Sequence, residues 1–172
     1  MNLSAETRRR LRHVHGYIGL EMFRAAAAEL AAIAVGERQA PEVRLTRMDF
    51  YIAASRWESA VRIGATLARK DPSCEQAWIG WAYALRELQR VTEAKEVLLV
   101  AEVAHGVTSA LVHYNLACYD ALLGDLAEAR ARLVKAYRLD KTLKETAEHD
   151  PDLAALRAAD AKRRAGDPAE GA

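Results

Sequence analysis

The stretch DLAEARARLVKA, residues 125–136, places a bulky apolar residue three positions before an alanine. Three other stretches do the same: MFRAAAAELAAI (22–33), RWESAVRIGATL (56–67) and RVTEAKEVLLVA (90–101). Their alanines recur at intervals of 34, 34 and 35 residues, as Ala26, Ala60, Ala94 and Ala129. A near-constant period of this length is typical of an array of helical repeats.

Each stretch also predicts one apolar helix face, because small or apolar residues continue at helical spacing after the alanine. These residues are Leu30, Gly64, Leu98 and Leu133, then Ile33, Leu67, Ala101 and Ala136. A second helical segment precedes each stretch, roughly at residues 5–19, 41–54, 74–88 and 109–122. The sequence therefore predicts an all-α fold of eight helices in four antiparallel hairpins.

Several signals mark where helices begin. Pro41 suits a first helical turn, and two pairs match the capping-box pattern, Ser73 with Gln76 and Thr142 with Glu145. After the repeats, Asp150 and Pro151 predict the start of a further helix that ends at Gly166. Its apolar face, with Leu153 and Leu156, suits it to cover the last hairpin.

The pattern resembles the tetratricopeptide repeat over about residues 7–141, and the fourth repeat matches best. It carries the asparagine–leucine–small triplet, the glycine between its helices and both small packing residues, namely Asn115, Leu116, Ala117, Gly124, Ala129 and Ala136. The third repeat adds the favoured Trp78 and the small Ala82. Three residues depart from the family pattern. Arg47 stands where the family has a buried leucine, and Gly64 stands where it has a larger apolar residue. Trp81 also replaces a leucine and needs extra room between hairpins.

The resemblance implies a right-handed superhelical solenoid. It assigns residues 1–141 to four hairpins (about 7–40, 41–74, 75–109 and 110–141). From the helix signals after the repeats we expect C-terminal capping helices over residues 142–166 and a disordered tail over residues 167–172.

Composition excludes some functional classes. The chain has 25 basic and 24 acidic side chains, so its near-zero net charge creates no field that favours nucleic acid or an anionic membrane. The most apolar run, AAAAELAAIAV, is too short to span a membrane, and the N-terminus lacks the apolar core of a signal peptide. We therefore expect a cytoplasmic protein.

No residue pattern predicts catalysis. Cys118 follows His113 by five positions, so the two point about 140° apart on a helix and cannot form a thiol–imidazole pair. His13 and His15 are about 200° apart and cannot chelate one metal by themselves. Because phosphate-loop, Gly-x-Ser-x-Gly and Cys-x-x-Cys motifs are also missing, we expect neither an enzyme nor a cofactor.

The resemblance instead implies a concave groove, lined by the first helix of each repeat, that binds a segment of another protein. The residues projected onto that groove are Arg12, His15, Asp49, Gln76, Ile79, Tyr83, Arg86, Tyr114, Asn115 and Cys118. We expect the bound segment to combine an acidic portion with an apolar anchor.

Two alternatives to such an adaptor remain. The size and fold would also suit a chaperone for an exported protein. Less favoured is an enzyme or a nucleic-acid binder that uses the basic cluster RRRLRH, residues 8–13, on the first helix. Self-association as a homodimer is left open by the sequence.

Overall fold

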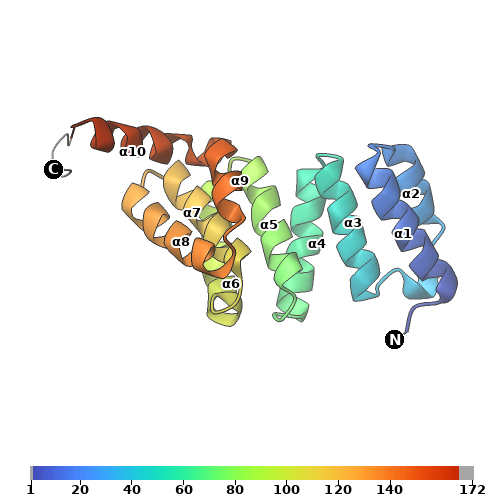
Figure 1. The fold of residues 1–172 in the computed structure, drawn as a ribbon. Coiled ribbons are helices and arrows are strands. Elements are labelled where there is room, and N and C mark those ends of the chain that lie inside the picture. The colour runs from blue at the N-terminus through green and yellow to red at the C-terminus, as the bar shows by residue number, and fades with distance from the viewer. Residues whose placement is uncertain (1, 167–172) are drawn as a thin grey trace. The chain divides into compact units, whose positions relative to one another are not determined.

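The computed structural model describes residues 2–166, whose helices divide between two compact units (Figure 1). The N-terminal unit, residues 1–89, contains α1 (Ala5–Gly19), α2 (Phe23–Ala31), the 3-10 turn η1 (Val35–Glu37), α3 (Pro41–Ala53), α4 (Trp57–Lys70) and α5 (Glu75–Glu87). The C-terminal unit, residues 90–172, contains α6 (Val91–His105), α7 (Ala110–Leu122), α8 (Leu126–Leu139), α9 (Leu143–His149), the 3-10 turn η2 (Pro151–Leu153) and α10 (Ala154–Gly166).

The predicted all-α class is confirmed. The tail expected to be disordered, residues 167–172, lies outside the described residues.

The periodic residues occupy equivalent positions in four helices. The bulky residue of each repeat is the first residue of α2, α4, α6 or α8, and the alanine that follows it is completely buried. An alanine at this position lets a neighbouring helix approach closely, since its side chain is a single methyl group. The period seen in the sequence is therefore a period of helix packing.

The tight turn that precedes each of these helices also repeats. Its backbone adopts a positive φ at Glu21 (56°), Ser55 (54°), Gln89 (61°) and Gly124 (88°). Only glycine adopts this left-handed conformation without a steric cost. Three of the four turns therefore carry a side chain where the fold favours glycine, and only Gly124 could be recognised from the sequence.

The two predicted capping boxes are wrong. Neither α5 nor α9 has a side chain that caps its N-terminus. The hydroxyl of Ser73 donates to Asp71 Oδ1 (2.6 Å) instead, and that of Thr142 donates to Asp140 Oδ1 (2.7 Å). A carboxylate two residues upstream is a stronger acceptor for the hydroxyl, which is drawn away from the helix terminus. The prediction for Pro41 is confirmed, because it begins α3.

Packing in the N-terminal unit explains two departures from the repeat pattern. A Cβ added at Gly64 on α4 would lie 2.8 Å from the Cβ of Trp81 on α5. A Cβ added at Gly80 would likewise clash with Cε of Met48, which is completely buried. The glycines thus provide the room that the tryptophan and the methionine need.

The C-terminal unit buries charge instead. Asp120 on α7 has no exposed surface, and its carboxylate pairs with Lys95 Nζ (2.5 Å) and Arg132 Nε (2.9 Å). Arg132 also pairs with Glu102 Oε1 at 2.8 Å. Helices α6, α7 and α8 are therefore linked by a buried ionic network.

The chain after α8 packs back onto the last hairpin. The turn η2 contacts α7, α9 contacts α8, and α10 contacts both α7 and α8. Leu153 and Leu156 are buried, as the apolar spacing of this segment predicts. This C-terminal cover, residues 143–157, determines which side chains of α7 remain accessible.

Candidate functional site

Helices α1, α3 and α5 of the N-terminal unit lie side by side, since α3 contacts both of the others. They are the first helices of their repeats. Seven of the predicted groove residues lie on them, and we call the surface that these residues form the α1–α3–α5 face. Its members are Arg12, His15, Asp49, Gln76, Ile79, Tyr83 and Arg86.

Polar contacts link neighbouring helices on this face. His15 Nε2 lies 3.3 Å from Thr46 Oγ1, which joins α1 to α3. The Gln76 amide donates to both carboxylate oxygens of Asp49, at 3.1 and 3.2 Å, which joins α5 to α3. Burial raises the pKa of Asp49 above its usual range, and the Gln76 hydrogen bond opposes that rise. The structure thus brings the predicted residues Asp49 and Gln76 together, whereas His15 pairs with Thr46, which the sequence did not single out.

The rest of the face offers an aromatic surface and two cations. Tyr83 is 39% exposed and packs edge-on against Trp57, with ring centroids 6.1 Å apart. Arg86 pairs with Glu87 at 2.7 Å, and Arg12 is exposed. Ile79 is half-buried. Such a surface can accept hydrogen bonds, cover an apolar side chain and attract an acidic one.

The three predicted residues of the C-terminal unit do not form an open surface. Tyr114 is 6% exposed and Cys118 is 3% exposed. The Tyr114 hydroxyl donates to Asp150 Oδ2 at 2.7 Å, and Cys118 Sγ lies 3.6 Å from the same oxygen. The half-buried Asn115 donates its amide to Leu111 O at 2.8 Å. The C-terminal cover occupies this side of α7, so the expectation of an open surface here is corrected.

The pKa of Tyr114 is raised by burial and by the hydrogen bond to the Asp150 carboxylate. The phenol therefore stays neutral and keeps donating to Asp150. His113 faces elsewhere, with Nε2 2.7 Å from Gly106 O. Cys118 and His113 thus have different partners, as their spacing on the helix predicts.

The basic cluster on α1 is largely paired with acids. Arg9 lies 2.6 Å from Glu6, Arg10 lies 2.7 Å from Glu29, and His13 lies 3.2 Å from Glu29. The hydrogen bond with His13 is the main cause that lowers the pKa of Glu29, and Arg10 lowers it further. Burial has the opposite effect but does not outweigh them. This pairing offsets part of the positive charge of the cluster, while Arg12 remains exposed.

Within residues 2–166, no three histidine, cysteine or acidic side chains are grouped to hold a metal ion. In the same range, no helix is long and apolar enough to cross a membrane.

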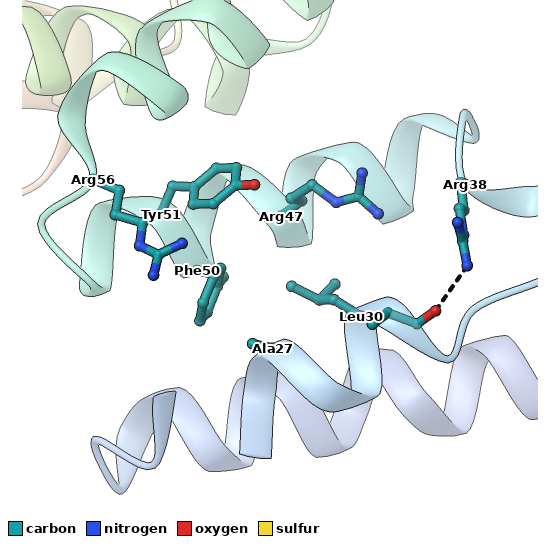
Figure 2. Close-up of a pocket in the computed structure, with 8 residues that line it drawn as sticks. Ala27, Leu30, Arg38, Arg47, Phe50, Tyr51 and Arg56 are labelled. Carbon is teal, nitrogen blue, oxygen red and sulfur yellow. Dashed lines mark hydrogen bonds between the residues drawn. The ribbon is translucent and has the colours of Figure 1, made fainter. Parts of the chain in front are cut away.

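Sequence reasoning missed a pocket of about 290 Å³ between α2 and α3 (Figure 2). It is lined by Ala27, Leu30, Ala31, Arg38, Arg47, Phe50, Tyr51 and Arg56. The only sequence signal was Arg47, which stands where the repeat expects a buried leucine.

Known structures are similar to this chain. TTC0263, a thermophilic TPR protein in Thermus thermophilus, is 22% identical, with a TM-score of 0.70 over 87% of this chain and 79% of the other. MamA RS-1, as an ArsTM double mutant, is 16% identical, with a TM-score of 0.66 over 81% and 78%. MamA AMB-1 is 20% identical, with a TM-score of 0.61 over 77% and 72%.

No family model matches the sequence, and no curated protein matches it. At these identities the structural likeness shows the fold. Taken with the packing of the repeat residues, it establishes that the chain has the tetratricopeptide-repeat-like fold.

Proposed function

We propose that this protein is a non-catalytic adaptor that holds a segment of a partner protein against the α1–α3–α5 face. The observation that carries the proposal is the adjacency of these three helices, which keep polar and aromatic side chains at the surface. Helical-repeat proteins commonly use such extended surfaces to bind other proteins.

Each part of the face suits one part of a bound segment. The Asp49–Gln76 pair provides a carboxylate and an amide that can hydrogen-bond a peptide backbone. Tyr83 and Ile79 would cover an apolar anchor, and Arg12 would attract an acidic side chain at the other end of the face. This supports a partner segment with an apolar and an acidic portion.

We place this activity in the cytoplasm. Cys74 and Cys118 are both in the thiol form, and a reducing compartment would keep them so.

A capture experiment with matched variants tests the adaptor. The intact protein, a Gln76→Ala/Tyr83→Ala variant and a Lys141→Ala variant would be immobilised, and retained proteins identified by mass spectrometry. Lys141 is exposed and belongs to the C-terminal unit, so its replacement is the control. Circular dichroism and thermal unfolding would confirm that all three are folded.

The proposal predicts one protein that wild type and Lys141→Ala retain and the double variant loses. Equal retention by all three folded proteins would contradict it.

A further inference from the structure

The pocket between α2 and α3 exists because of three sequence choices. Arg47 replaces the leucine expected at this repeat position, and its side chain is only half-buried. Ala27 and Ala31 on the opposite helix are too small to fill the space. A volume of about 290 Å³ therefore remains open, close to the lower end of small-molecule pockets, about 300 Å³.

The pocket has an apolar wall between two cations. Figure 2 shows Arg47 and Arg56 on opposite sides of the Phe50 and Tyr51 rings, with Leu30 facing them from α2. Phe50 is 4% exposed and Leu30 is 5% exposed, so both are anchored in the core of the unit. The aromatic wall is therefore held in place before anything binds.

The charge of the pocket is not balanced. None of the eight lining residues is acidic. Arg38 donates to the carbonyl oxygens of Ile33 and Ala31, both at 2.8 Å, so its guanidinium group is already engaged in binding the backbone after α2. The guanidinium groups of Arg47 and Arg56, by contrast, form no hydrogen bond or ion pair with any of residues 2–166. Two guanidinium groups with unused donors thus flank an apolar wall.

We infer that this pocket binds an acidic peptide segment, with one carboxylate on Arg47, a second on Arg56, and an apolar side chain between them against Phe50 and Leu30. Guanidinium groups match carboxylates in geometry as well as charge. The pocket is separate from the α1–α3–α5 face, because Arg47 and Asp49 point about 200° apart on α3. The two sites can therefore succeed or fail independently.

A pentapeptide with the sequence glycine–glutamate–phenylalanine–glutamate–glycine, blocked at both ends, would be titrated into the intact protein and followed by NMR. A glutamine-for-glutamate peptide and inorganic phosphate would be titrated in parallel. We expect the glutamate peptide to shift the Arg47 and Arg56 Nε–H signals. It should bind about tenfold or more tightly than the glutamine peptide, since charge-assisted hydrogen bonds are lost in the latter.

Two variants distinguish the contribution of the open pocket volume from that of the arginine charges. Arg47→Leu restores the residue that the repeat carries at Leu116, so it should fold at least as stably as wild type while filling the pocket and abolishing peptide binding. Arg56→Gln should leave the pocket open and weaken binding. Lys141→Gln removes an exposed positive charge in the C-terminal unit, and this variant should bind as wild type does.

Three results would overturn the inference. The wild-type protein could bind the glutamate and glutamine peptides equally well, or the folded Arg47→Leu protein could bind the glutamate peptide as wild type does. Phosphate could also bind as tightly as the glutamate peptide. The last would indicate a general anion site rather than a peptide site.

Discussion

Tyr83 in the N-terminal unit and Cys118 in the C-terminal unit lie 35 residues apart, at the same position of the repeat. Tyr83 is 39% exposed, whereas Cys118 is 3% exposed beneath Asp150. The units differ in the core as well. Leu85 is a buried apolar residue, and its equivalent 35 positions later is the buried Asp120. The same repeat pattern therefore gives the N-terminal unit an open face and an apolar core, and gives the C-terminal unit a covered face and an ionic core.

The largest expected effect breaks the ionic core. Asp120→Ala leaves Arg132 and Lys95 without their shared partner, and we expect a loss of about 3–5 kcal/mol in the free energy of unfolding. Urea denaturation would measure it.

The double variant Asp120→Leu/Arg132→Val restores the residue types found at Leu85 and Val97, and it should lose less than Asp120→Ala alone. A single-variant loss below about 1 kcal/mol, the value typical of a surface pair, would refute the buried network.

Overpacking tests the apolar core. The Cβ of Gly64→Ala would press on the backbone and Cβ of Trp81, so we expect about 1–3 kcal/mol of destabilisation. Gly16→Ala on α1 is the control, because an added Cβ there meets no atom within 4 Å. It should stabilise by about 0.5–1 kcal/mol, and opposite signs in thermal unfolding are the expected result.

Substitutions at the positive-φ positions of the turns should change stability by a smaller amount. Gly124→Ala forces a side chain into a positive φ and should cost about 1–2 kcal/mol. The reverse change, Glu21→Gly, relieves the same strain in the first turn and should raise the melting temperature slightly. If both changes destabilised, the equivalence of the turns would be wrong.

The smallest effect concerns the open face. Burial raises the folded-state pKa of Asp49, so the unfolded chain releases its proton first as pH rises. As pH rises from the ordinary pKa of aspartate, about 3.9, to the raised pKa of the folded state, the wild-type protein therefore loses stability. Asp49→Asn should be more stable at pH 7, with an advantage that shrinks as pH falls through this window. Unfolding at pH 4 and pH 7 would show whether it does.

The repeat was predictable because one physical requirement recurs. A small residue must sit where helices cross, and Ala26, Ala60, Ala94 and Ala129 satisfy it visibly. The capping boxes failed because Asp71 and Asp140 compete for the same hydroxyls. Local patterns cannot rank such competing acceptors.

The candidate sites were harder to predict, since they depend on what packs above them. The burial of Tyr114 and Cys118 results from a segment more than 30 residues away, whose docking has no local signature. Conversely, Arg47 was visible as a departure, but the pocket beside it required the positions of Ala27 and Ala31.

The central claim is that the partner contacts the N-terminal unit and not the covered face of the C-terminal unit. Gln76 and Leu111 provide a matched pair, because both are exposed first-turn residues 35 positions apart on α5 and α7. A photo-crosslinking phenylalanine analogue would replace each in turn in the intact protein, and adducts would be identified by mass spectrometry. We predict a partner adduct from position 76 that is missing from position 111. An adduct from position 111 alone, or equal adducts from both, would contradict the claim.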